Sequence, residues 1–234
     1  MQAEFAGSSR PNARFTGIIY LLYFVTAIGG ELLLRGIVSP ENADSTASNL
    51  AAHRLRFQIG VGVGLASTAT YLALTGLFYR LFSAVNRYLS ATAAFFSIVG
   101  CAILATATLF RVLPVTLLGE HAYLEQFSPK QLHALAFFSF EVYGRCIQIS
   151  FVFFGVYCFL IGYLIYRSTF LPRLIGAWMM LTGLSWLIFL LPPLAHTLHA
   201  YIAANGFSCE LILMLWLILR GVDESRWQRI QMRM

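Results

Sequence analysis

The chain has 234 residues, of which 59% are hydrophobic and 11% are charged. Roughly one quarter of the residues in a soluble domain are charged, so this composition excludes a soluble globular protein and predicts an integral membrane protein. The length suggests one domain, and the net charge of +6 does not indicate nucleic-acid binding, because the positions of the arginines explain it better.

Six hydrophobic stretches reach or approach the roughly 20 residues that a membrane-spanning helix needs. They lie near 15–35, 57–79, 89–111, 134–166, 173–192 and 203–220. Continuous apolar runs predict helices, because the strands of a membrane barrel are shorter and alternate apolar with polar residues. The expected fold is an all-α bundle of six transmembrane helices. Its membrane domain, 15–220, lies between a polar leader, 1–14, and a basic tail, 221–234, which we expect to form a short surface helix.

Basic residues are unevenly divided between the two sides of these spans. One side carries ten arginines: Arg10, Arg14, Arg80, Arg87, Arg167, Arg173, Arg220, Arg226, Arg229 and Arg233. The other carries four basic residues: Arg35, Arg54, Arg56 and Lys130. Since cytoplasmic loops are enriched in Lys and Arg, this asymmetry predicts that both termini are cytoplasmic.

The first two spans suggest local interactions. Glu31 and Arg35 have the (i, i+4) spacing of a helical ion pair, which we interpret either as a salt bridge at the membrane boundary or as part of a binding site. In the second span, Gly60, Gly62 and Gly64 are typical of close helix contact, because no strand precedes them as a nucleotide-binding loop would require.

The fourth span belongs to an unusually long helical segment. Ser128-Pro129 has the pattern of a helix cap followed by a first-turn proline, and no proline interrupts the chain from there to Arg167. A helix of this length exceeds a bilayer core of about 30 Å. We therefore expect it to project from the membrane, to tilt, or to break near Gly144 or Gly155.

Within this segment, Glu141, Arg145 and Gln148 interrupt an apolar run rich in Phe, Ile and Val. Offsets of four and seven residues return to the same helix face, so the three side chains predict one polar stripe on an otherwise apolar helix. A polar stripe at membrane depth needs partners or a cavity.

Other ionisable residues within or beside the spans fall in the same half of the predicted bundle. They are Glu31, His53, Arg54, Arg56, Arg111, Glu141, Arg145, His196, His199 and Glu210. A lone charge at bilayer depth costs several kcal/mol, which favours mutual pairing around a shared polar space. The pattern thus predicts a polar cavity that opens outward, above a floor rich in phenylalanine.

The candidate ligand-binding residues are those expected to line this cavity: Glu31, Arg56, Arg111, Glu141, Arg145, Gln148 and Glu210. Arginine suits carboxylate or phosphate groups, and nearby phenylalanines suit an acyl chain or ring. A closed salt-bridge network that only holds the helices together is the alternative interpretation.

Metal and cofactor motifs are sparse. His196 and His199 have a helix-compatible spacing and are weak candidates for a metal site completed by a carboxylate. Because this spacing alone is a weak signal, we expect no metal. No Gly-x-Ser-x-Gly motif and no phosphate-binding loop occurs, and no cofactor is evident.

Several short motifs resemble a bacterial family of six-span membrane proteins known only as a domain of unknown function. They include Ala13-Arg14-Phe15, Leu77-x-Tyr79-Arg80-Leu81, Gly162-Tyr163-Leu164 with Arg167-Ser168, Leu171-Pro172-Arg173, and Glu210-Leu211 ahead of Trp216-Leu217. The resemblance implies a multi-pass protein of the bacterial cytoplasmic membrane. It implies no activity and no catalytic residue.

Three hypotheses for function follow. The first is a protein that binds a small amphiphile or lipid headgroup in the outward-facing cavity. The second is a membrane-embedded enzyme, with or without a metal, that acts on a lipid or isoprenoid. The third is a small transporter. It is suggested by a possible internal repeat, because two hairpins carry a similar Gly-x-x-(x)-Tyr-Arg motif, which ends at Arg80 in one and at Arg167 in the other. The lipid bilayer is the expected partner, no nucleic acid is expected, and the oligomeric state stays open.

Overall fold

The computed structural model describes residues 13–39, 42–119 and 121–232. Their helices are α1 (Ala13–Leu34), α2 (Ala43–Ala52), α3 (Arg54–Phe82), α4 (Arg87–Leu117), η1 (Ala122–Leu124), α5 (Pro129–Arg167), α6 (Arg173–Trp186), η2 (Leu187–Leu190), α7 (Pro192–Leu219) and α8 (Glu224–Gln231). The predicted leader lies outside the described residues except for its last two, which begin α1.

Six helical segments are long and apolar enough to cross a membrane: α1, α3, α4, α5, α6 with η2, and α7. The predicted all-α bundle of six spans is therefore confirmed, and the chain belongs in a lipid bilayer. Two predicted boundaries were wrong. The third span continues past Pro114 to Leu117, and the last helix begins at Pro192 rather than near 203, because proline is tolerated in the first turn of a helix.

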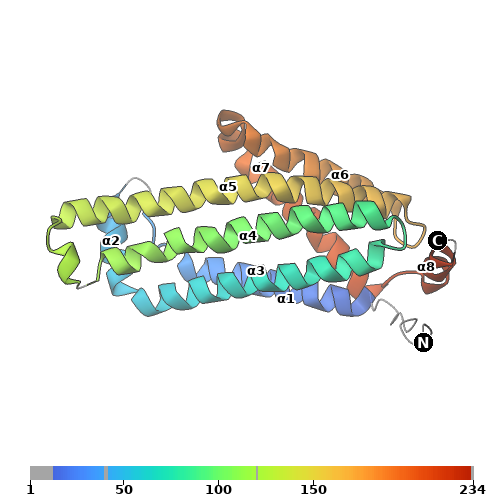
Figure 1. Cartoon of the computed structure of the whole chain (residues 1–234), viewed down its shortest axis with the longest axis horizontal. Helices are drawn as coiled ribbons and strands as arrows, with labels where there is room; N and C mark the ends of the chain where they lie inside the picture. The colour runs from blue at the N-terminus through green and yellow to red at the C-terminus, as the bar shows by residue number, and fades with distance from the viewer. Residues whose placement is uncertain (1–12, 40–41, 120, 233–234) are drawn as a thin grey trace, which may run out of the picture.

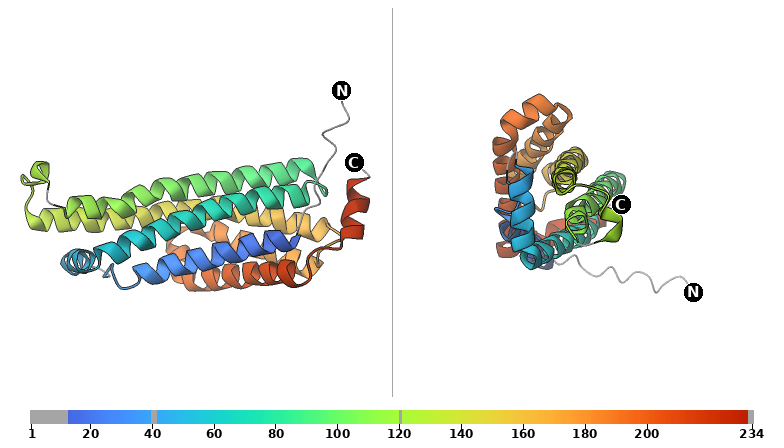
Figure 2. Two further views of the ribbon diagram at one scale, coloured as in Figure 1. Left: turned by 90° about the horizontal axis from the view of Figure 1, so that it is seen from below. Right: turned by 90° about the vertical axis from the view of Figure 1, so that its left-hand side faces the viewer.

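The long helices run side by side along the longest axis of the molecule (Figure 1). Figure 2 shows α2 lying across one end of the bundle and α8 across the other. We call these the α2 end and the α8 end. The α8 end holds the start of α1, the α3–α4 and α5–α6 turns and the end of α7, so it corresponds to the side predicted to be cytoplasmic.

Helix α5 is continuous over 39 residues, and neither Gly144 nor Gly155 breaks it. A helix of this length spans roughly 58 Å at 1.5 Å per residue. Its start is fixed by a capping box: the Gln131 backbone N–H donates to Ser128 Oγ, and the Ser128 N–H donates to Gln131 Oε1 at 2.8 Å. The sequence allowed the helix to project from the membrane, to tilt or to break near one of these glycines. The predicted break was wrong, because the helix is continuous.

Helices α5 and α6 approach each other through two pairs of glycines. Gly162 faces Gly176, and Gly155 faces Gly183, with the backbone of one helix against the backbone of the other. A β-carbon at Gly183 would lie 2.6 Å from the carbonyl oxygen of Gly155, so no larger residue fits. Such contacts between small residues allow the close packing on which membrane helices depend.

The glycines of the second span, which predicted a close helix contact, meet a neighbouring helix only in part. Gly30 of α1 lies against the backbone of Gly60 and Gly64 of α3, where an added β-carbon would be 3.1 Å from the Gly64 nitrogen. A β-carbon on Gly62, in contrast, would meet nothing within 4 Å. A β-carbon on Gly64 would likewise meet nothing within 4 Å, so Gly64 contributes only the backbone against which Gly30 lies. A β-carbon on Gly60 would lie 2.8 Å from the Leu34 side chain, which confirms the predicted close contact for Gly60 and not for Gly62.

The main hydrophobic core fills the α8 end. Phe78, Phe82, Phe170 and Trp227 are buried within it, and the Trp227 indole N–H donates to the carbonyl of Leu81 at 3.0 Å. The tail therefore forms the expected short helix, and that helix docks on the protein itself through Trp227.

Acidic pH should loosen this docked helix. Asp223 caps α8: the Ser225 hydroxyl donates to its carboxylate at 2.7 Å and the Arg226 backbone N–H at 3.1 Å, and these bonds hold the pKa of the exposed carboxyl below its usual value. A depressed folded pKa means that the stabilisation is present above the unfolded pKa and is lost as pH falls through the folded pKa. We expect the fluorescence emission of Trp227 to shift to the red as pH falls over that acidic range. The emission of Trp227 is obtained by subtracting the spectrum of Trp227→Phe from that of the wild type, because the chain has four tryptophans.

The Asp223→Ala variant should show the red shift already at neutral pH. An emission spectrum of the variant that matches the wild type throughout the titration would contradict the role of Asp223 as the cap that holds α8.

Candidate functional site

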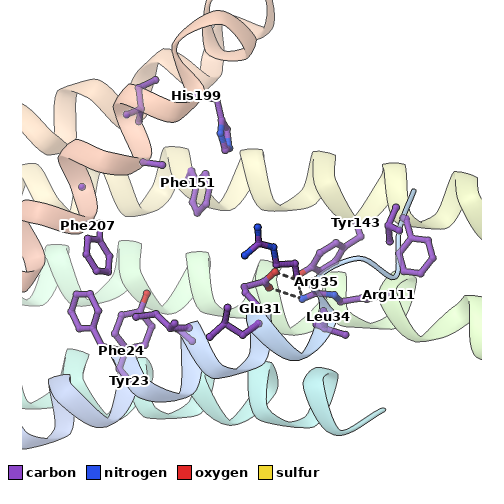
Figure 3. A pocket seen from close by; sticks show the side chains of 18 of the residues that line it. Tyr23, Phe24, Glu31, Leu34, Arg35, Arg111, Tyr143, Phe151, His199 and Phe207 are labelled. Atoms are coloured by element: carbon purple, nitrogen blue, oxygen red, sulfur yellow. Dashed lines mark hydrogen bonds and ion pairs between the residues drawn. The ribbon is translucent and has the colours of Figure 1, made fainter. Parts of the chain in front are cut away.

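A cavity of about 770 Å³ lies in the half of the bundle nearer the α2 end. The C-terminal half of α1 and the middle parts of α5 and α7 form its walls, and Phe57 of α3, Arg111 of α4, Trp186 and Phe189 complete it. Figure 3 shows side chains from α1, α5 and α7 converging on this space. A ligand the size of a small lipid or amphiphile fits within this volume.

Most of the cavity wall is aromatic or aliphatic. The apolar lining includes Tyr23, Phe24, Ala27, Ile28, Leu32, Leu34, Ile37, Val38, Phe57, Phe140, Phe151, Trp186, Phe189, Ile202, Ala203 and Phe207. The charged residues in the lining are Glu31, Arg35, Arg111, Glu141 and Glu210. The sequence indicated a polar cavity, whereas the wall is mainly carbon with a few charged groups set into it.

Arg111 makes polar contacts with two other helices at the α2 end of the cavity. Its guanidinium donates to both carboxylate oxygens of Glu31, at 3.0 and 3.3 Å, and to the hydroxyl of Tyr143 at 2.6 Å. The guanidinium carbon also lies 4.5 Å from the centre of the Tyr143 ring. These contacts, drawn in Figure 3, join α1, α4 and α5. A bidentate arginine–carboxylate pair is among the stronger charge-assisted interactions in proteins.

The predicted (i, i+4) pair between Glu31 and Arg35 does not form. Helix α1 ends at Leu34, so Arg35 follows the helix instead of continuing its spacing, and Glu31 pairs with Arg111. Figure 3 shows the Arg35 side chain reaching into the cavity. Within the described part of the chain its guanidinium has no ion pair.

Arg56 lies outside the cavity lining. Its guanidinium donates to the backbone carbonyl of Arg35 at 2.8 Å and to that of Leu32 at 3.4 Å. Leu32 lies in the last turn of α1 and Arg35 directly follows it, where backbone oxygens lack the partners of a continuing helix. Arg56 thus terminates α1 and fixes the backbone from which Arg35 projects.

The polar stripe of α5 is divided by the tertiary structure. Glu141 lines the cavity, but Arg145 is exposed and Gln148 is half-buried, and neither belongs to the lining. No ion pair joins Glu141 to Arg145 among the described residues. Beside Glu141, α5 contributes Phe140, Tyr143 and Phe151 to the cavity lining. Since α5 also packs against α4 and α6, residues that share one stripe need not share one environment.

Glu210 marks the inner end of the cavity. The residue is only 7% exposed. It also borders a second cavity of about 100 Å³, which Ser67, Thr68 and Cys101 help to line. Glu210 thus borders both cavities, as do Tyr23 and Trp186.

The two histidines of the weak metal prediction both lie in α7, because that helix begins at Pro192. Only His199 lines the cavity, where its ring is 5.9 Å from that of Phe189. Across the residues that the structure describes, no group of three or more His, Cys, Asp or Glu is placed to hold a metal ion.

Sequence reasoning missed several residues of the site. Arg35 was not among the candidate ligand-binding residues, and Tyr143, Trp186 and Phe207 were not singled out. Tyr143 could have been found, since it lies within the polar stretch of α5 and carries a hydroxyl. Trp186 and Phe207 resemble the other apolar residues of their spans, so no local signal distinguishes them.

The fold and the cavity together define a multi-pass helical membrane protein with an open cavity in one half of its bundle. Residues 15–221 match a family described as "Domain of unknown function (DUF4386)", and the chain belongs to that family. This confirms the family type that the motifs indicated.

An uncharacterized protein of Archaeoglobus fulgidus is 29% identical to the chain over 76 residues. The match covers 32% of this chain and 46% of the relative, so the chain spans about half the length of that protein. No solved structure matches the chain. These likenesses place the protein in a family and give no activity.

Proposed function

We propose that the protein binds a small amphiphile or lipid in the cavity between α1, α5 and α7, with the polar head of the ligand at the α2 end. The single observation that carries this proposal is the unpaired Arg35 guanidinium, which projects into one end of a large apolar cavity. The Arg111–Glu31 pair beside it is already satisfied, so Arg35 is the cation available to a carboxylate, phosphate or other acceptor.

The apolar body of the ligand would lie along the aromatic wall of the cavity. Trp186 and Phe151 meet edge to face there, with ring centres 4.5 Å apart. The buried indole N–H of Trp186 finds no acceptor among the described residues, which makes it a free donor beside the cavity. Buried donors usually have a partner, so a ligand acceptor at this point would supply the missing bond.

A binding role is favoured over transport by the packing of the α8 end. The core there includes Leu74, Leu81, Leu164 and Ile165, none of which is measurably exposed. A path through the bundle would have to part these side chains. With the α2 end facing outward, as the arginine distribution predicts for a cytoplasmic membrane, the head of the ligand would be on the outer side.

Ligand retention by arginine variants tests this proposal. Wild-type protein purified in mild detergent should carry about one amphiphile per chain by native mass spectrometry. Arg35→Gln should lose it, because removing a hydrogen bond to a charged group costs about 1.5–3 kcal/mol, or roughly tenfold to more than a hundredfold in affinity. Arg145→Gln is the matched control, since Arg145 is exposed and outside the lining.

Equal retention by wild type, Arg35→Gln and Arg145→Gln would contradict an Arg35 head site. A wild-type lipid content that merely mirrors the bulk membrane would contradict selective binding.

A further inference from the structure

The carboxyl of Glu210 is placed in the interior of the bundle, away from the charged groups of the α2 end. It lies near the middle of α7 and lines both the large and the small cavity. Only 7% of the residue is exposed. The binding of a head at Arg35 makes no use of it. A charged carboxylate at such a position is unfavourable unless something compensates it.

No cation of the described chain compensates this carboxyl. The ion pairs of the described residues do not include Glu210. The titratable groups that surround it are the hydroxyls and thiols of Tyr20, Tyr23, Tyr71, Cys101, Tyr157, Cys158 and Cys209, which come from α1, α3, α4, α5 and α7. Such groups can donate hydrogen bonds, but none supplies a positive charge. Either a proton or a cation from a ligand must neutralise Glu210.

The rings that line the cavity beside Glu210 suit a cation. Phe24 and Phe207 meet edge to face with centres 5.4 Å apart, and Phe151 meets Trp186 in the same way. All four line the large cavity with Glu210, as does Tyr23. An ammonium group over the faces of Trp, Tyr or Phe is attracted by the ring quadrupole, and walls of this kind recognise alkylammonium groups.

The arginines of the cavity do not occupy this inner end. Arg111 is held by Glu31 and Tyr143, and Arg35 projects from the end of α1 near Leu34. The cavity therefore has cationic side chains toward the α2 end and an uncompensated carboxyl among aromatic rings at the inner end. A ligand that satisfies both ends carries an acceptor at one end and a basic nitrogen at the other.

We infer that Glu210 and the aromatic rings around it form a binding site for a protonated amine, so the ligand class is an amphiphile whose apolar body ends in a basic nitrogen. The inference deepens the proposed function and rests on it, because the same cavity holds the ligand. The carboxylate supplies the charge partner, and the aromatic rings supply the apolar wall around it.

A matched pair of probes tests the inference on the wild-type protein. Isothermal titration in detergent with 4-phenylbutylamine and with 4-phenylbutan-1-ol compares a cation with a neutral molecule of similar size and shape. We expect the amine to bind at least about tenfold more tightly than the alcohol. Glu210→Gln should abolish this preference, while Glu125→Gln, which changes an exposed carboxylate outside the cavity lining, should retain it.

Equal affinity of the two probes for the wild type would overturn the inference, and it would do so even if Glu210→Gln failed to fold. Retention of the amine preference in a folded Glu210→Gln variant would also overturn it. A wild type that retains an amphiphile through Arg35 but does not prefer the amine would refute the amine site alone. A wild type that neither retains an amphiphile nor binds either probe would refute both the amine site and the proposed function.

Discussion

Gly162→Ala is expected to destabilise the protein by about 1–3 kcal/mol, although it adds a single methyl group to an interior helix position. The new β-carbon would lie 2.5 Å from the backbone nitrogen of Met180 and 2.8 Å from the carbonyl oxygen of Gly176. Neither atom belongs to a flexible side chain, so α5 and α6 would have to separate along the whole contact. The loss would appear as a lower midpoint in thermal unfolding followed by loss of helical circular dichroism.

Gly144→Ala is the matched control, because it makes the same substitution in the same helix. A β-carbon at Gly144 meets nothing within 4 Å, and alanine favours the helix over glycine by about 1 kcal/mol. We expect this variant to be as stable as the wild type or more so. Equal unfolding midpoints for the two variants would show that the close α5–α6 contact does not limit stability.

The second large effect is expected for Arg111→Met. The substitution removes the bidentate pair with Glu31 and the bond to Tyr143, while it retains an apolar chain of similar length. The Arg111 side chain is 13% exposed, but that of Glu31 is 68% exposed, so the pair is worth less than a fully buried one. We expect a loss of about 1–3 kcal/mol in unfolding free energy.

A double-mutant cycle with Glu31→Gln isolates the pair. The coupling energy from the two single variants and the double variant should be about 1 kcal/mol or more. Arg145→Met provides the reference for losing an exposed arginine that has no ion pair in the described structure. Strictly additive losses for Arg111→Met and Glu31→Gln would indicate that the contact between α1 and α4 contributes nothing to folding.

The site could be predicted from the sequence only in part. Glu31, Arg111, Glu141 and Glu210 were expected to line one cavity, and the structure brings them to its lining. Arg56, Arg145 and Gln148 had the same kind of sequence signal and lie elsewhere. A charged residue in a span indicates that it needs a partner, but its residue type does not say whether that partner is a ligand, a helix terminus or solvent.

Local features of the chain determined the membrane architecture. The apolar runs predicted the six spans because a helix satisfies its own backbone hydrogen bonds wherever lipid surrounds it. Ser128 and Gln131 predicted the start of α5 because a helix cap involves only neighbouring residues. The glycines of α3 predicted a close helix contact because residue size, which limits how closely two helices approach, can be read directly from the sequence.

The partners across helices were decided only by the tertiary structure. Glu31 takes Arg111, 80 residues away, in preference to Arg35, four residues away, because α1 ends at Leu34 before the local spacing can be used. The rings of α1, α5, α6 and α7 that face Glu210 meet only after these helices have packed. Periodicity defines the faces of one helix, whereas the angle and depth at which helices cross determine which faces share a space.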